Sequence, residues 1–208
     1  MAPSERFARL WSDILNPLYL SPPLFVISGW LVGSDVFSLA TAFGISLTSL
    51  TFAPLMYLTV LTRQGRIEGF DVLNRTDRPG IYIFGLSCYL AAIALLWMAE
   101  ITPKSHYVFI CLVYIINTLI FFGINKFTKI SVHSASIATV GTLIATFIPL
   151  GQTMMIVSAT ILFSVMTGIM IWSRVVLHCH TLGQAVSGAT LGALLPLIER
   201  FIIYPMLV

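Results

Sequence analysis

The stretch TMMIVSATILFSVMTGIMIWSRVVLHCHTLGQ, residues 153–184, decides how this chain folds. Residues 153–172 carry no charge, and about 20 apolar residues are enough to cross the hydrocarbon core of a bilayer as one helix. Arg174, His180 and Gln184 follow at once, and another apolar run begins at residue 182. Polar side chains at the end of a membrane helix are costly to bury and usually have a function there. The stretch therefore predicts a membrane helix that leads into a polar site.

The composition extends this interpretation to the whole chain. Of the 208 residues, 58% are hydrophobic and only 9% are charged, whereas about 25% of a soluble domain is charged. We expect an all-α fold, a polytopic membrane bundle of six or seven transmembrane helices that forms one domain over residues 1–208. The net charge of +3 is too small and too scattered for nucleic acid. It suits an anionic membrane surface and a phosphate ligand.

Seven apolar segments are candidates for these helices. They comprise residues 11–32, 36–61, 80–99, 107–124, 130–150, 153–172 and 182–205. The first contains Pro17, Pro22 and Pro23, which cannot occupy a helix interior without kinks, so we expect a surface helix that leads into a short span. It has no small-residue cleavage site, so no signal peptide is predicted. The cysteines give no disulfide framework and are interpreted as packing or spacer residues: Cys88, Cys111 and Cys179.

If each of the seven segments crosses the membrane once, three polar stretches lie on the same face of the membrane as the N-terminus: residues 62–79, 125–129 and 173–181. A shared face is what a single site requires. Nine of the eleven basic residues lie on it: Arg6, Arg9, Arg63, Arg66, Arg75, Arg78, Lys126, Lys129 and Arg174. Because lysine and arginine are enriched in cytoplasmic loops, we expect a multi-pass protein of the cell membrane with its site on the cytoplasmic face.

The same three stretches resemble, in order, the motifs of the type-2 phosphatidic acid phosphatase superfamily, membrane enzymes that cleave phosphate from lipids. The first motif of that superfamily is Lys, six residues, Arg-Pro; here Arg78 and the proline after it match, and Asp71 holds the lysine position. The second is Pro-Ser-Gly-His, of which Ser131 and His133 are kept, with Val132 in place of glycine.

The third motif is Ser-Arg, five residues, His, three residues, Asp. Ser173, Arg174 and His180 match it, and Gln184 replaces the acid, as in the glucose-6-phosphatase and dolichyl diphosphate phosphatase branches. The resemblance covers about residues 71–192 and implies a catalytic core over about residues 71–205. It implies that His180 attacks phosphorus, that Gln184 holds the other ring nitrogen, and that His133 protonates the leaving oxygen.

The phosphate-binding residues implied by the resemblance are Arg78 and Arg174, with Ser131 as a neutral donor. Planar guanidinium groups pair with phosphoryl oxygens in a bidentate manner, so this chemistry needs no cofactor and no metal. Lys129 and Arg75 are the two substitutes for the missing lysine. The sequence offers no carboxylate cluster for a divalent cation.

The resulting expectation is a metal-independent phosphatase acting on a membrane lipid phosphate, either an isoprenoid mono- or diphosphate or a phosphatidate-type lipid. The alternative is a non-catalytic relative, a membrane subunit or lipid-binding scaffold, because Asp71, Val132 and Gln184 depart from the motifs. The sequence shows no paired broken helices with ionisable residues at the membrane midplane, so it does not indicate a transporter.

Several of these residues also have purely structural interpretations. His133 could cap or pack the start of a helix, and Arg174 could be an interfacial anchor beside Trp172. His178 fits an interface residue better than a catalytic one. Gly188 and Gly192, four residues apart, favour close helix packing, with a lateral slot for a lipid tail as the other interpretation.

Overall fold

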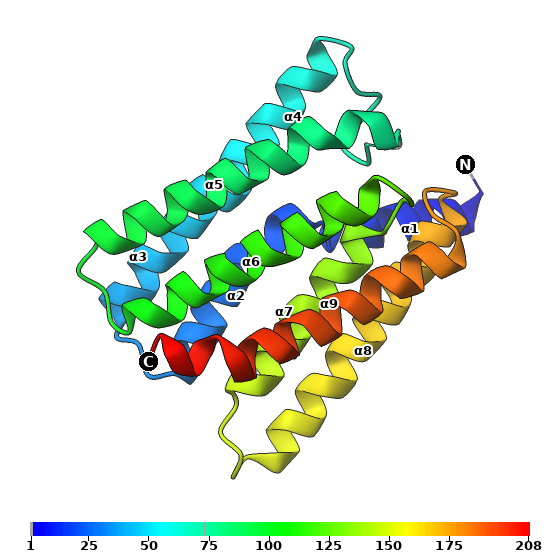
Figure 1. The fold of residues 1–208 in the computed structure, drawn as a ribbon. Coiled ribbons are helices and arrows are strands. Elements are labelled where there is room, and N and C mark those ends of the chain that lie inside the picture. The colour runs from blue at the N-terminus through cyan, green and yellow to red at the C-terminus, as the bar shows by residue number, and fades with distance from the viewer. Residues whose placement is uncertain (1, 73) are drawn as a thin grey trace.

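The computed structural model describes residues 2–72 and 74–208. Over these residues the chain is 80% helical and has no strand, which confirms the all-α expectation (Figure 1). The α-helices are α1 (Pro3–Ile14), α2 (Pro17–Leu31), α3 (Val36–Ser46), α4 (Ala53–Arg63), α5 (Arg78–Met98), α6 (Lys104–Asn125), α7 (Val132–Phe147), α8 (Thr153–Val176) and α9 (Leu182–Ile202). A π-helical segment, Leu47–Phe52, joins α3 and α4 into one continuous rod.

Within the described part of the chain, five helical segments are long and apolar enough to cross a membrane, and α1 and α2 add a sixth if together they form one bent span. The fifth expected segment, residues 130–150, is shorter than predicted. α7 has 16 residues, fewer than the roughly 20 needed to cross straight. It packs against α2, α8 and α9, so much of its apolar surface faces other helices.

The chain bends between α1 and α2. The two helix axes meet at 46°, and the break falls at Leu15 and Asn16, where the Asn16 side chain accepts the Leu18 N–H at 3.0 Å. Pro17 occupies the first turn of α2, where its missing N–H costs nothing. The bend thus lies before the first proline, and α2 continues through Pro22 and Pro23.

α7 and α9 form the closest helix pair of the bundle. A Cβ added to Gly188 would collide with the Ser131 carbonyl, and one added to Gly192 would collide with the Ala135 carbonyl. The Thr139 hydroxyl donates to the Gly192 carbonyl at 3.0 Å across the same contact. The close packing predicted for these glycines is therefore confirmed.

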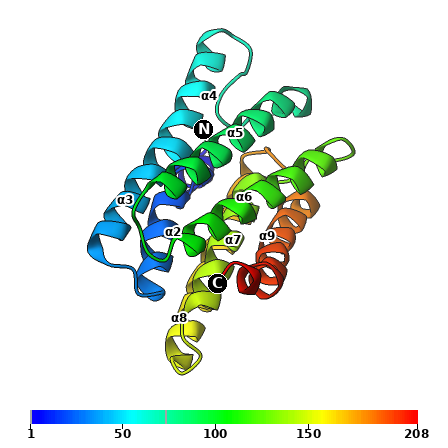
Figure 2. The same ribbon diagram turned by 60° about the vertical axis from the view of Figure 1, so that its left-hand side comes forward.

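The three polar stretches meet at one end of the bundle, together with α1. In Figures 1 and 2, the loops α4–α5, α6–α7 and α8–α9 lie at the same end, and the loops α2–α3, α5–α6 and α7–α8 lie at the opposite end. The Arg75 guanidinium donates to the Phe127 carbonyl at 3.0 Å, and that of Arg174 donates to Asp71 at 2.7 Å. We call this end, with residues 62–79, 125–131 and 173–181, the polar end.

Candidate active site at the polar end

The first turn of α9 orients His180. Thr181 is the N-cap of this helix: its hydroxyl accepts the Gln184 N–H, and its own N–H donates to Gln184 Oε1, each at 3.3 Å. This reciprocal capping arrangement turns the amide oxygen of Gln184 back over the helix terminus. His180 Nδ1 lies 3.3 Å from the same oxygen. The spacing of His180 and Gln184 therefore brings the two side chains into contact.

The capping contact also determines which ring nitrogen of His180 carries the proton. Gln184 Oε1 already accepts the Thr181 N–H, so it faces His180 as an acceptor and Nδ1 must be the donor. Burial, followed by the positive charges of Arg78, Arg174 and Lys129, lowers the pKa of His180 to about 3. The ring is thus neutral near pH 7, with a lone pair on Nε2.

His133 lies in the first turn of α7 and is not its cap. Ser131 is the N-cap: its hydroxyl oxygen accepts the Ser134 N–H at 3.3 Å and lies 3.0 Å from Ser134 Oγ. The hypothesis that His133 caps the helix is therefore wrong. The same geometry commits the Ser131 hydroxyl, proposed as a phosphate donor, to a local helix cap.

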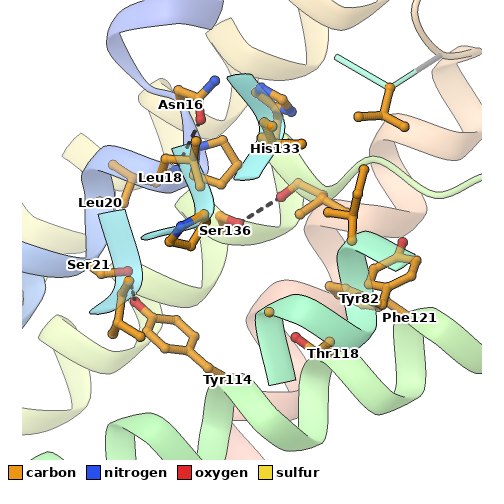
Figure 3. A pocket seen from close by; sticks show the side chains of 18 of the residues that line it. Asn16, Leu18, Leu20, Ser21, Tyr82, Tyr114, Thr118, Phe121, His133 and Ser136 are labelled. Atoms are coloured by element: carbon orange, nitrogen blue, oxygen red, sulfur yellow. Dashed lines mark hydrogen bonds between the residues drawn. The ribbon is translucent and has the colours of Figure 1, made fainter. Parts of the chain in front are cut away.

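A cavity of about 220 Å³ joins His133 and His180. Asp71 and Arg78 also line it, so residues from all three motif-like stretches border this cavity. Figure 3 shows His133 and Ser136 projecting from α7 towards it, opposite Tyr82 and Phe121. Away from the polar end its walls are mostly apolar or aromatic, with Leu18, Leu20, Leu50, Tyr57, Phe84, Tyr114 and Phe121 among them.

Arg78 is held by two backbone carbonyls. Its Nε donates to Val72 at 3.1 Å and its Nη1 donates to Ile130 at 3.2 Å, so the guanidinium ties the α4–α5 loop to the start of α7. The side chain is buried, yet it lines the cavity. Val132, the residue at the glycine position of the second motif, lines the cavity as well.

Arg174 has no exposed surface, which contradicts the hypothesis of an interfacial anchor. Its Nη1 donates to Ser12 Oγ and to Asp71 Oδ1, both at 2.7 Å. Its Nε and Nη2 are buried and have no hydrogen-bond partner among the residues that the structure describes. These two nitrogens form the side-on edge of the guanidinium, the pair of donors that binds two oxygens of one anion. Arg174 does not itself line the cavity.

Asp71 bridges two arginines at the position where the motif has lysine. Its second oxygen accepts from Arg9 Nη1 at 2.6 Å, while Arg174 binds the first. Burial acts to raise the pKa of Asp71, but Arg174 and Arg9 outweigh it and lower the pKa to about 2. The carboxylate is therefore ionised at any physiological pH.

The two substitutes for the missing lysine lie outside the cavity. Arg75 is exposed and donates to the Phe127 carbonyl at 3.0 Å. Lys129 does not line the cavity, although its charge contributes to the lowered pKa of His180. Its own pKa is lowered, chiefly by burial and then by Arg78.

The contribution of α1 to the site was not predicted from the sequence. Ser12 and Arg9 contact Arg174 and Asp71, and the Ala8 carbonyl accepts the Ser173 hydroxyl at 2.6 Å. The only signal was Arg6 and Arg9 beside polar residues ahead of the first apolar run.

Comparisons of the chain with protein-family models, with curated proteins and with solved structures gave no match. Over residues 2–72 and 74–208, no group of three or more His, Cys, Asp or Glu side chains is placed to hold a metal ion.

Proposed function

We propose that this protein is a membrane lipid phosphate phosphatase that resembles the type-2 phosphatidic acid phosphatases and works through a phosphohistidine. One observation carries the proposal. His180, with Nδ1 held by Gln184, shares a cavity with His133 and Arg78, and the rest of that cavity is mostly apolar. A neutral, oriented imidazole beside a second histidine and a buried guanidinium is suited to transfer a phosphoryl group from a lipid.

In the first step, His180 Nε2 attacks phosphorus, and the bond from phosphorus to the lipid oxygen breaks. His133 gives its proton to that oxygen, so the product is an alcohol, or a phosphorylated lipid when the substrate is a diphosphate. In the second step, water attacks the phosphohistidine, His133 takes a proton from it, and the phosphorus–nitrogen bond breaks. Inorganic phosphate leaves, and both histidines return to their starting states.

Arginines bind the phosphoryl oxygens in this scheme. Arg78 borders the cavity, and the side-on edge of Arg174 carries two buried donors without partners. Preorganised donors of this kind typically contribute about 10²–10³-fold each to the rate. The carboxylate nearest to them, Asp71, is already bound by two arginines.

The mostly apolar walls of the cavity support a lipid tail as part of the substrate. An isoprenoid mono- or diphosphate fits this scheme first, and a phosphatidate-type lipid second. The excess of arginine and lysine at the polar end supports a site on the cytoplasmic face of the cell membrane, where isoprenoid phosphates are made.

One observation favours the alternative, a non-catalytic relative that binds lipids. Arg174 does not line the cavity, and a carboxylate already occupies its Nη1. A chain that has lost phosphatase activity could retain such an ion pair for stability alone.

Phosphate release from a panel of lipid phosphates, by detergent-purified protein with and without EDTA, tests the proposal. We expect release that EDTA does not reduce and that vanadate inhibits, since vanadate adopts the trigonal bipyramidal geometry of the transition state. His180→Ala should abolish the release. The matched control is His178→Asn, which changes an exposed histidine two residues away and keeps a side chain that tolerates its φ of +53°. Release that requires magnesium, or no release from any lipid, would contradict the proposal.

A further inference from the structure

The side-on edge of Arg174 is buried and unpaired, and this state is costly for a charged donor group. A buried donor without a partner loses its hydrogen bonds to water without replacement, and the cost is larger when the donor is charged. The cost is reduced at only one nitrogen, Nη1, by Ser12 and Asp71. An anion that bound the side-on edge would satisfy both remaining donors, but it would lie on the same guanidinium as the Asp71 carboxylate, and the two negative charges would repel each other.

Asp71 is more accessible from the cavity than Arg174 is. Asp71 lines the cavity beside His180, whereas Arg174 does not. The Asp71 side chain is 18% exposed, against 0% for that of Arg174. Arg174 binds only one carboxylate oxygen of Asp71, because Arg9 Nη1 donates to the other oxygen at 2.6 Å.

Arg9 gives the carboxylate another place to bind. Its side chain is 40% exposed, so it can follow Asp71 outward, while Arg174 is fixed in the interior. Asp71 can therefore leave Arg174 and keep one ionic partner. An entering phosphoryl group that replaced it would restore a negative partner to Arg174, so the charge balance of the interior would be preserved.

We propose that Asp71 is the resident anion of the phosphate site, a carboxylate that occupies Arg174 until a phosphoryl group displaces it towards Arg9. This inference rests on the proposed function and deepens it, because it makes Asp71 a residue that sets the affinity for the phosphoryl group. It also accounts for a carboxylate at a lysine position: the residue acts as a competitor of the substrate, and Arg9 from α1 supplies the cation.

The test compares the affinity for inorganic phosphate of wild type, Asp71→Asn, Asp71→Glu and Asp77→Asn, by titration calorimetry in detergent. Asp71→Asn removes the competing charge and keeps the size of the side chain, so we expect phosphate to bind about tenfold more tightly, the usual order for one direct charge contact. Asp71→Glu keeps the charge and should bind phosphate like wild type. Asp77→Asn removes a carboxylate of the same loop that pairs with Thr76 instead of an arginine, and should change the affinity less than about twofold.

Thermal unfolding of the same proteins gives a second measurement. Without phosphate, Asp71→Asn should unfold at a lower temperature than wild type, because Arg174 loses its carboxylate. Saturating phosphate should remove most of that difference, since it binds the folded state. An equal gain of affinity in Asp71→Asn and Asp77→Asn would overturn the inference in favour of a general field effect.

Weaker phosphate binding in Asp71→Asn would also overturn it, and would make Asp71 a residue that positions Arg174; the proposed function would stand. If neither wild type nor Asp71→Asn binds phosphate or shows any stabilisation by it, the proposed function fails, and this inference fails with it.

Discussion

Each end of the bundle holds a buried histidine and an arginine, but the arginine is fully buried at the polar end and only half-buried at the opposite end. At the end opposite the site, the His106 Nε2 atom of α6 lies 3.0 Å from Ser28 Oγ, and its ring packs edge-on against Phe147 with centroids 4.5 Å apart. The Arg200 guanidinium lies over the Tyr204 ring, 4.1 Å from its centroid. These side chains are enclosed by aromatic rings, and His106 is completely buried.

At the polar end the corresponding residues face a cavity or keep unused donors. His180 lines the cavity with Nδ1 held from behind by Gln184, and Arg174 has two buried nitrogens without partners. Burial of a polar residue in a membrane bundle is therefore a poor guide to function. Unpaired buried atoms are no better a guide, because His106 Nδ1 and Arg200 Nε also lack a hydrogen-bond partner among the described residues. The two ends differ in the cavity, which His180 lines together with His133 and Arg78, whereas His106 and Arg200 do not line it.

The largest expected difference between the two ends is in catalysis. His180→Ala should reduce phosphate release by about 10³-fold or more, because the proposed mechanism needs its imidazole to form the phosphohistidine, and should leave the unfolding temperature nearly unchanged. His106→Ala should retain activity per folded molecule and lower the unfolding temperature by roughly 4–8 °C, the effect of losing about 2 kcal/mol of buried contacts. Phosphate release and thermal unfolding on the same samples check both. Equal loss of activity per folded molecule in His180→Ala and His106→Ala would show that the two ends do not differ in catalysis.

Within the site, His133→Ala should separate substrates by their leaving groups. The first step should slow by about 100-fold for an alkyl phosphate, whose oxygen needs a proton, and by less than about tenfold for a nitrophenyl phosphate. Burst kinetics isolate that step. Ser136→Ala is the matched control, since its hydroxyl lines the same cavity but donates to the Val132 carbonyl. Equal slowing of both substrates would mean that His133 is not the general acid.

The two ends should also differ in accessibility. In a background without the three native cysteines, Gln64→Cys at the polar end should resist an impermeant thiol reagent in intact cells and react after permeabilisation. Glu100→Cys, an exposed residue of the opposite end, should react in intact cells at once. The ratio of labelling should exceed about tenfold. The reverse pattern would place the site outside the cell.

The smallest effect concerns pH. The pKa of His180 is lowered, so its neutral form persists as the pH falls from 7 to 5 and is lost only near pH 3. The rate of phosphohistidine formation should therefore not fall by more than about twofold over that interval. Rapid-quench measurements at pH 5, 6 and 7 check this. A fall with a midpoint near 6.5, the ordinary value for histidine, would show that His180 is not shielded as described.

The long helices could be predicted because hydrophobicity alone determines them. The apolar run at 80–99 corresponds to α5, Arg78–Met98, and the run from 182 to 205 corresponds to α9, Leu182–Ile202. The π-helical segment Leu47–Phe52 could not be predicted, since a change from the usual to the wider hydrogen-bond register leaves no mark on hydropathy. For the first segment, the position of the break depended on the cap at Asn16, which outweighed the prolines further on.

The same division applies to the site. The contact between His180 and Gln184 follows from a spacing of four residues at a helix start, so sequence alone predicted it. The contacts of Asp71 with Arg9 and Arg174 join residues 62 and 103 positions apart. They depend on the path of the α4–α5 loop and on where α1 packs, and neither property is encoded in a local pattern.

The contact at Gly188 has a consequence for how this protein can vary. His133 belongs to α7 and His180 precedes α9, and the distance between these helices is limited by a glycine against the Ser131 carbonyl. Any side chain at residue 188 would push the two histidines apart without touching either one. In a library of all single substitutions, Gly188 should thus tolerate replacement as poorly as His180 does, although glycine has no side chain that could take part in the reaction. The proposed activity would then depend on the absence of a methyl group at residue 188 as much as on the imidazole of His180.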